Sequence, residues 1–287
     1  MGNMDAVLIQ ERRGARRMAD VPASVRALVE AGQSETVNLM EWLAADMSAL
    51  ARAVAAECDP ALAQALNAAA AKVVGIGVTD RLAVLGGAVA AAAPEGSSFE
   101  LIASHRSDIV RQWACYAANL LPGLTLERRL AATLRFADDP NMSVRETAWM
   151  AFRPHLARDL HAGLPLLQKL VNSPVANVRR FAVEVSRPRS VWGAHVAELK
   201  RRPERGARLL EPVKADESRY VRLAVGNWLN DASKTRPDWV EGVCARWEPE
   251  GNPHTLSIIR RGKRTLVRKA EAVVAGLFET SFAGGAA

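Results

Sequence analysis

Two glutamates of this chain, Glu146 and Glu184, are the candidate acids for general acid–base chemistry. Glu184 lies between Arg180 and Arg187, and a carboxylate is costly on a surface that binds phosphate, because it repels the phosphate. The cost of this repulsion favours a functional role for the Glu184 carboxylate. The alternative is an ion pair of Glu184 with Arg180 at the i, i+4 spacing, which stabilises a helix by only about 0.2–0.5 kcal/mol. Both interpretations stay open.

Glu146 has a structural alternative, and the sequence favours it. The segment Ser143-Val-Arg-Glu146 has the spacing of a capping box, in which a serine caps a helix and a glutamate three residues later binds back to the serine backbone. Used in this way, Glu146 would stabilise the start of a helix and take no part in chemistry.

Two tryptophans, Trp149 and Trp192, are candidate contacts for a cationic base. An exposed indole ring can stack on such a base by cation–π attraction, or it can pack under the next loop. Trp149 lies on the polar face of an expected helix, where no core requires it, so we favour the functional interpretation. Trp192 follows Pro188, which ends a helix, and both interpretations stay open.

No other catalytic or cofactor-binding pattern is present in the sequence. It contains no Gly-rich phosphate loop, no metal-type spacing of His or Cys, and no elbow around a nucleophilic serine. The three cysteines are far apart and are expected to be free thiols in a reducing cytoplasm. We therefore expect neither a metal nor a cofactor.

Five Val-Arg or Ile-Arg dipeptides recur along the chain and indicate the elements that position these residues. Their arginines are 34, 34, 43 and 38 residues apart, a period that is typical of stacked helical hairpins. An aromatic content of 5% and the lack of period-two alternation also favour an all-α fold. The five arginines are Arg111, Arg145, Arg179, Arg222 and Arg260.

An aspartate precedes two of these arginines by six residues, since Asp139 precedes Arg145 and Asp216 precedes Arg222. This offset resembles HEAT repeats, in which such an Asp and Arg bridge neighbouring repeats. The sequence therefore predicts a HEAT-like repeat solenoid of antiparallel helical hairpins. The recurring arginines are predicted to form its structural ladder and to bind no ligand.

The repeats also set a common frame for the helices, with the Val or Ile of each dipeptide at zero and about 100° per residue. Residues at offsets 3, 4 and 7 are predicted to face the core, and they include Trp113 and Trp228. The opposite face, at offsets 2, 5, 6 and 9, is predicted to line the concave side of the solenoid, and we call it the polar column. Its cations and aromatic rings suit nucleic acid, where cations bind phosphates and rings contact bases or sugars. The polar column consists of Gln112, Cys115, Tyr116, Asn119, Glu146, Trp149, Met150, Arg153, Arg180, Val183, Glu184, Arg187, Leu223, Gly226, Asn227, Asn230, Arg261, Arg264, Thr265 and Arg268.

The net charge of +7 is concentrated in the repeats. Residues 1–100 carry 8 Lys/Arg against 12 Asp/Glu, a net charge of −4, and the remainder carries 30 against 19, a net charge of +11. Such a basic region favours a polyanionic partner, nucleic acid first, although an Arg-rich composition can also reflect a GC-rich genome. The longest apolar run, around residues 82–93, is too short to span a bilayer, and the N-terminus lacks the order of a signal peptide. We expect a cytoplasmic protein without a membrane anchor.

The chain of 287 residues is expected to form one helical domain with short tails. Residues 1–20 are predicted to be a flexible tail and residues 276–287 a C-terminal tail. The domain between them, 21–275, is predicted to comprise N-terminal helices over 21–96 and recognisable repeats over 97–275.

Three runs of sequence carry a family resemblance. They are NVRRFAVEVSRPRSVW at 177–192, SRYVRLAVGNWLND at 218–231 and IIRRGKRTL at 258–266. These runs resemble the AlkC branch of the AlkC/AlkD alkylpurine DNA glycosylases, and the likeness covers about residues 100–270. The first hundred residues match poorly, and the chain is expected to end without the additional C-terminal domain of some members.

The resemblance implies an all-helical, C-shaped, HEAT-like fold whose basic concave face holds duplex DNA. Such DNA-repair enzymes excise cationic alkylated bases, N3-methyladenine or N7-methylguanine among them, by hydrolysing the N-glycosidic bond without metal or cofactor. A cationic purine is already a good leaving group. What helps is a carboxylate that stabilises the oxocarbenium-like sugar and orients water, with aromatic rings beside the positive charge.

The resemblance also implies roles for individual residues. Glu184 would be the carboxylate, with Trp149 and Trp192 as aromatic walls. Members of the branch carry a second acid near the position held here by Trp149, and Glu146 is the nearby substitute. The residues that would bind DNA phosphates are Arg153, Arg180, Arg187, Arg189, Arg261 and Arg264.

Three functions stay open at this point. The first is a monofunctional alkylbase glycosylase that acts as a monomer on duplex DNA in a bacterial cytoplasm, associated with the nucleoid when bound to DNA. The second is a HEAT-repeat protein that binds DNA without catalysis, and the third is a protein-interaction scaffold. Basic charge in the polar column favours the first two over the third.

Overall fold

The computed structural model of the chain describes the backbone of residues 12–283 and the side chains of residues 12–272. It is 73% helical and contains no strand in the described part. The prediction of an all-α, helical-repeat fold is confirmed. No helix within residues 12–283 combines the length and the apolar composition that a membrane span requires.

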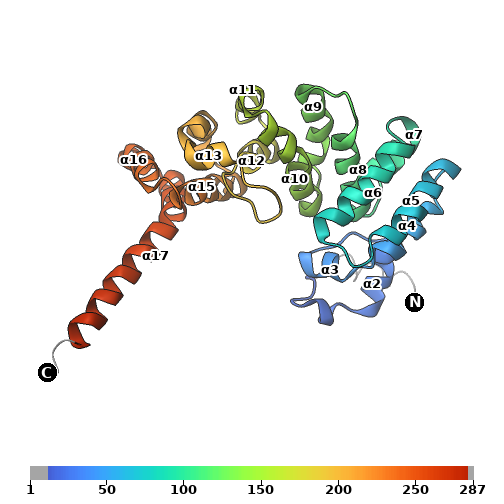
Figure 1. The fold of residues 1–287 in the computed structure, drawn as a ribbon, viewed down its shortest axis with the longest axis horizontal. Helices are drawn as coiled ribbons and strands as arrows, with labels where there is room; N and C mark the ends of the chain where they lie inside the picture. Colours follow the sequence, from blue (N-terminus) through green and yellow to red (C-terminus); the bar gives the residue numbers. More distant parts are fainter. Residues whose placement is uncertain (1–11, 284–287) are drawn as a thin grey trace. The chain divides into compact units, whose positions relative to one another are not determined.

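The chain divides into two compact units, unit 1 (Met1–Phe152) and unit 2 (Arg153–Ala287) (Figure 1). The division falls inside helix α10, within the region 21–275 that the sequence predicts as one domain. The single-domain organisation stays a prediction.

Unit 1 is built from helices that pack in sequential order, α4 on α5 and α5 on α6. Helices α6 and α8 cross closely, because Gly86 of α6 lies directly against α8. A Cβ at Gly86 would clash with the Cβ of Tyr116 and lie 3.0 Å from the carbonyl oxygen of Trp113. The helices of this unit are α2 (Ala23–Glu30), α3 (Leu39–Ala44), α4 (Met47–Ala55), α5 (Pro60–Lys72), α6 (Val78–Ala92), α7 (Gly96–Ala103), α8 (Asp108–Leu120), α9 (Leu126–Ala137) and most of α10 (Met142–Arg158), preceded by the short 3-10 turn η1 (Met18–Asp20).

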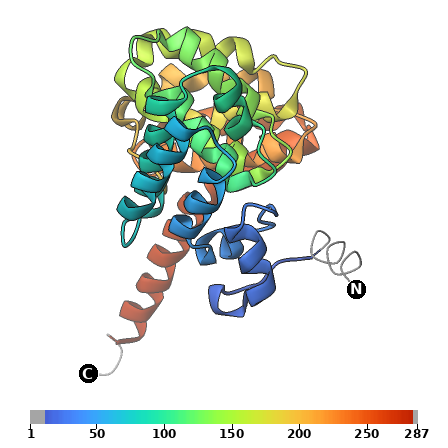
Figure 2. The same ribbon diagram turned by 90° about the vertical axis from the view of Figure 1, so that its right-hand side faces the viewer.

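Unit 2 is organised around α15, which packs against α12 on one side and α17 on another. Gly226 permits the approach of α17, because a Cβ at that position would lie 2.8 Å from the Cβ of Arg261. Figure 2 shows α17 as one continuous helix. The helices of this unit are α11 (Leu160–Leu170), α12 (Ala176–Val185), α13 (Ala197–Arg201), α14 (Ala207–Leu210), α15 (Arg219–Ser233), α16 (Pro237–Trp247) and α17 (Pro253–Ala283), with 3-10 turns η2 (Pro203–Gly206), η3 (Glu211–Val213) and η4 (Glu248–Glu250).

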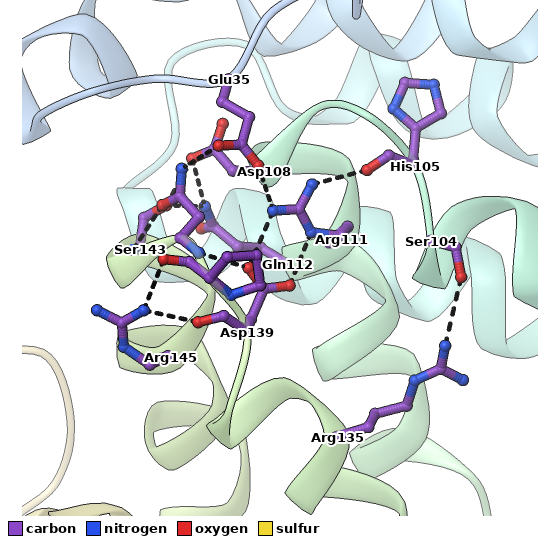
Figure 3. A network of polar contacts seen from close by, with 12 residues as sticks. Glu35, Ser104, His105, Asp108, Arg111, Gln112, Arg135, Asp139, Ser143 and Arg145 are labelled. Atoms are coloured by element: carbon purple, nitrogen blue, oxygen red, sulfur yellow. Dashed lines mark hydrogen bonds and ion pairs between the residues drawn. The ribbon is translucent and has the colours of Figure 1, made fainter. Parts of the chain in front are cut away.

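The predicted ladder of arginines and aspartates is present in both units. In unit 1, Arg111 binds Asp139 with two hydrogen bonds of 2.8 and 2.9 Å, and Arg145 donates to the Asp139 carbonyl oxygen (Figure 3). In unit 2, Arg179 binds Asp216 with hydrogen bonds of 2.7 and 2.9 Å. Arg111 and Arg179 thus join consecutive hairpins as predicted, while Arg145 and Arg222 donate to carbonyl oxygens in the turn before their own helix. Arg260 is exposed, and its ladder role stays a prediction.

The same junctions in unit 1 hold the segment before α3. Arg111 also pairs with Glu35 at 2.5 Å, and the fully buried Asp108 accepts hydrogen bonds from the backbone and hydroxyl of Thr36 (Figure 3). The N-terminal helices are therefore tied to the repeats by buried polar contacts in addition to apolar packing.

The predicted tails differ from the structure where it describes them. Arg12 donates to the carboxylate of Glu41 at 2.8 and 2.6 Å, and Asn38 donates to the carbonyl of Ala15 at 2.8 Å. Residues 12–20 are therefore anchored, and the prediction of a flexible tail is wrong for them, while residues 1–11 lie outside the described part. Helix α17 continues to Ala283, so most of the tail predicted over 276–287 is helical, and residues 284–287 lie outside the described part.

The core prediction is confirmed for Trp113 and Trp228, which are both 0% exposed. The polar column, by contrast, is not a solvent-facing surface as we expected. Its helices are covered on that side as well, since α6 covers α8 and α17 covers α15. Members of the column that are buried include Gln112, Cys115, Asn119, Trp149, Arg153, Arg180, Val183, Glu184 and Asn230.

Candidate functional site

Glu184 lies near the end of α12 in a cluster of arginines. One carboxylate oxygen pairs with Arg187 at 2.5 Å, and the other lies 3.5 Å from Arg180. The ion pair with Arg180 that the sequence left open therefore forms. It is buried, since only 4% of Glu184 is exposed. Two guanidinium groups thus hold this carboxylate in a fixed orientation.

A second buried carboxylate, Asp231 near the end of α15, shares the same arginine. Arg187 donates to one Asp231 oxygen from Nε at 2.9 Å and approaches it with Nη2 at 2.8 Å. Lys234 lies 3.4 Å from the other oxygen. Burial lowers the pKa of Arg187, but the charges of Glu184 and Asp231 raise it by more. Arg187 therefore bridges two anions, and its predicted role as a phosphate contact gives way to that of a bridge.

Our sequence interpretation missed Asp231 as a site residue. The frame of offsets ended at 9, and Asp231 lies ten residues after Val221, at the last position of the run 218–231. The signal that could have found Asp231 is its position near the end of α15. The packed neighbour α12 carries Glu184 near its end and is followed by Arg187. That signal requires knowing that α12 and α15 pack together.

The prediction that Arg153 binds phosphate is wrong, because its side chain is only 2% exposed. Its guanidinium donates to three carbonyl oxygens, those of Val185 at 2.8 Å, Arg187 at 2.7 Å and Ala194 at 2.8 Å. Burial, and then the charge of Arg187, lowers the pKa of Arg153 to about 10. Arg153 ties the end of α12 to the loop that follows it.

That loop, residues 186–196, presents Trp192 to solvent, with 39% of the residue exposed. The exposed position agrees with the functional interpretation of Trp192. Arg189 of the same loop is half-buried and donates to the Asp231 carbonyl at 3.3 Å. The loop thus lies beside the carboxylate pair, with an indole ring and a cation on it.

Trp149 is not exposed as we expected, since only 4% of it is accessible. Its indole N–H donates to the Glu146 carboxylate at 2.7 Å. The capping box predicted for Glu146 is also wrong, because Asn141 caps α10 by accepting from the Ser143 backbone at 2.9 Å, and the Ser143 hydroxyl donates to Asp108. Glu146 and Trp149 form a hydrogen-bonded pair within unit 1.

The remaining predicted contacts of unit 2 are Arg180, Arg261 and Arg264. The Arg180 guanidinium lies over the ring of Tyr220, 4.2 Å from its centre. Arg261 donates to the side-chain oxygen of Asn227 at 2.8 Å. Burial and then the charge of Arg264 lower the pKa of Arg261. Arg264 has no ion pair or hydrogen bond among the described side chains, so its charge is available to a ligand.

Positive charge exceeds negative charge in this part of unit 2. Four arginines interact with Glu184, two through ion pairs and two through longer-range electrostatics that oppose the lowering of their pKa values. They are Arg153, Arg180, Arg187 and Arg261. The site therefore combines two buried carboxylates with a surplus of cations, which suits a polyanion that carries a local positive charge.

The described residues offer no group of three or more His, Cys, Asp or Glu side chains arranged to hold a metal ion. The cysteines are free thiols, and burial raises the pKa of Cys244 to about 11. The chemistry that this arrangement supports is electrostatic and acid–base chemistry by carboxylates and arginines.

Comparison with solved structures finds a helical relative. Over 88% of this chain and 66% of the other, the structure matches Pseudomonas fluorescens alkylpurine DNA glycosylase AlkC bound to DNA containing an abasic site analog, with a TM-score of 0.64 and 26% identity. AlkD2 from Streptococcus mutans matches over 74% of this chain and 97% of that chain, with a TM-score of 0.49 and 20% identity.

Comparison of sequences adds one curated relative and no family profile. The chain is 39% identical over 132 residues to the protein YhaZ of Bacillus subtilis (strain 168), whose description is "uncharacterized". The match covers 46% of this chain and 37% of YhaZ, so the chain matches less than two thirds of the length of YhaZ and of AlkC. No protein-family profile matches the chain.

Proposed function

We propose that this chain, whose fold is of the AlkC/AlkD type that the family resemblance implies, is a DNA glycosylase that removes cationic alkylated bases from duplex DNA. The observation that carries the proposal is the pair of buried carboxylates, Glu184 and Asp231, bridged by Arg187. Paired anions beside an exposed indole ring are what a site needs when positive charge develops on a bound sugar and base.

The proposed reaction is hydrolysis of the N-glycosidic bond. The bond between the sugar and the alkylated base breaks, and its electron pair leaves with the base, which becomes neutral. The sugar takes on oxocarbenium character, and a water molecule adds to its anomeric carbon and loses a proton to a carboxylate or to solvent. Because the base leaves readily, no strong general acid is needed.

In this proposal each residue of the site has a different role in the reaction. Glu184 stabilises the positive sugar and accepts the proton of the attacking water, and Asp231 adds a second negative charge. Arg187 holds both carboxylates in place, because it pairs with each of them. Trp192 contacts the cationic base.

The remaining predicted residues take supporting roles. Arg189 and Arg264 bind phosphates directly, while Arg180 and Arg261 contribute charge from half-buried or buried positions. Trp149 and Glu146 act as one hydrogen-bonded pair. The C shape and the basic concave face stay predictions.

The partner in this proposal is duplex DNA with an alkylated base, bound by a monomer in the cytoplasm. The structure of AlkC bound to DNA containing an abasic site analog supports DNA as the partner class. Neither metal nor cofactor is required, because the leaving group is activated by its own charge.

A second function, DNA binding without catalysis, is favoured by one observation. Glu184 is 4% exposed and already occupied by two arginines. A carboxylate used only to hold α12 and its loop would show the same contacts.

Base release from methylated DNA distinguishes the two functions. We expect the wild-type protein to release methylated purines from alkylated duplex, and Asp231→Asn to release them about 10–100 times more slowly with unchanged duplex affinity. The matched control is Asp238→Asn on α16, an exposed aspartate that pairs with Arg236. Release by wild type at the background rate, with tight salt-dependent binding, would leave the non-catalytic function.

A further inference from the structure

The loop after α12 carries an unusually exposed aliphatic side chain. Val191 is 88% exposed, more than the 69% of Val74 or the 50% of Val267. It adjoins Trp192, so the middle of the loop presents two apolar side chains to solvent. These two adjacent apolar side chains, in the middle of a charged segment, are available to contact a ligand.

The loop is held rigidly at its base. The backbone N–H of Val196 donates to the Pro188 carbonyl at 3.1 Å and closes the loop on itself. The Arg153 guanidinium joins the two ends of the loop, because it donates to the carbonyl oxygen of Arg187 near its start and to that of Ala194 near its end. A buried arginine with all three of its nitrogen groups used in this way fixes where the loop points, at little further entropic cost when a ligand binds.

The charge around the loop matches DNA. The segment 187–202 contains five cations and one carboxylate, Glu198, which pairs with Arg205 at 2.8 Å. Arg189, within the loop, donates to the carbonyl oxygen of Asp231, which places the loop beside the carboxylate pair. Phosphates on either side of a bound base would meet cations, and the apolar middle of the loop would meet the bases themselves.

We propose that Val191 is a wedge that enters the base stack next to the alkylated base and, with Trp192, holds the damaged nucleotide apart from its neighbours. Proteins that distort duplex DNA commonly insert an apolar side chain at a base step and recover the cost of unstacking through contacts made by the deformed DNA. This inference rests on the proposed DNA glycosylase function and assigns recognition of the lesion to the 186–196 loop. Val191 has no part in bond cleavage.

The probe is a duplex that carries an abasic-site analog with 2-aminopurine as the adjacent base, whose fluorescence increases when it unstacks. At saturating wild-type protein the fluorescence is expected to rise. With Val191→Ser the rise is expected to be lost, and affinity for this duplex to fall about tenfold, since a valine side chain is no longer buried. Affinity for an undamaged duplex at the same salt concentration is expected to stay within about twofold, because its phosphate contacts are unchanged.

Val74→Ser is the matched control, since it makes the same change at an exposed valine of unit 1, and it is expected to behave as wild type. Equal fluorescence and affinity for Val191→Ser and wild type would overturn the wedge while leaving the glycosylase proposal standing. If wild type binds neither duplex, the proposed function fails, and the wedge with it.

Discussion

Substitution of Arg153 by methionine separates a structural role from a DNA-binding role. The side chain is 2% exposed and donates three hydrogen bonds of 2.7–2.8 Å to carbonyl oxygens. A hydrogen bond from a charged donor contributes about 1.5–3 kcal/mol, and burial of the guanidinium charge offsets part of the total. We expect Arg153→Met to lower the free energy of unfolding by about 3 kcal/mol, because three carbonyls lose their donor.

Urea unfolding followed by circular dichroism measures this loss as a lower midpoint with an unchanged slope. Limited proteolysis provides a local readout, since the loop at 186–196 is expected to become cleavable once its base is released. Arg264→Met is the matched control, because Arg264 has no ion pair or hydrogen bond among the described side chains, and its unfolding midpoint is expected to stay at the wild-type value. A variant Arg153→Met of wild-type stability, with a salt dependence of DNA binding reduced by about one phosphate, would refute the structural role.

Three further predictions concern packing, the ladder and pH. Gly86→Ala is expected to lower the free energy of unfolding of unit 1 by about 1–3 kcal/mol in urea, because the added methyl group clashes with α8. The control Gly242→Ala on α16, where a Cβ meets nothing within 4 Å, is expected to stabilise slightly, and equal effects of the two substitutions would contradict the close crossing. Asp216→Asn is expected to cost about 2–3 kcal/mol in the same assay, since it leaves Arg179 without its carboxylate, and a neutral result would contradict the ladder. Burial lowers the pKa of His105, so the unfolded chain binds the proton more readily and stability is expected to fall as the pH drops below about 6.5; His105→Gln is expected to flatten that dependence.

The repeat architecture could be predicted because its signals are periodic and local. The recurrence of Val-Arg indicates where the second helices of the hairpins lie, and each of Val110, Val144, Val178 and Val221 lies in the first turn of such a helix. The pairing of Asp216 with Arg179 follows from the repeat spacing alone, since a ladder contact joins equivalent positions of consecutive hairpins. Trp113 was predictable as core because it lies on the face that every repeat must bury.

The candidate site could be predicted only in part. The helical frame assumes that each helix buries one face, but α8 and α15 are covered on two. On α10, Trp149 and Arg153 are buried too, although the residue pattern of that helix places them on its polar face. Arg153 was expected to face phosphates because of its place in the polar column and the family resemblance, and the structure satisfies it with carbonyl oxygens more than thirty residues away in sequence. Asp231 joins Glu184 only through Arg187, a contact between two helices that no local spacing indicates.

The most direct test of the account is single-turnover release of methylated purine from alkylated duplex by Glu184→Gln. The substitution keeps the size of the side chain and removes the charge that would stabilise the sugar cation. The expected rate is about 10²-fold below wild type with duplex affinity retained, and the matched control Glu241→Gln, at an exposed glutamate of α16, is expected to react at the wild-type rate. Release by Glu184→Gln at the wild-type rate would contradict the assignment of Glu184 as the catalytic carboxylate.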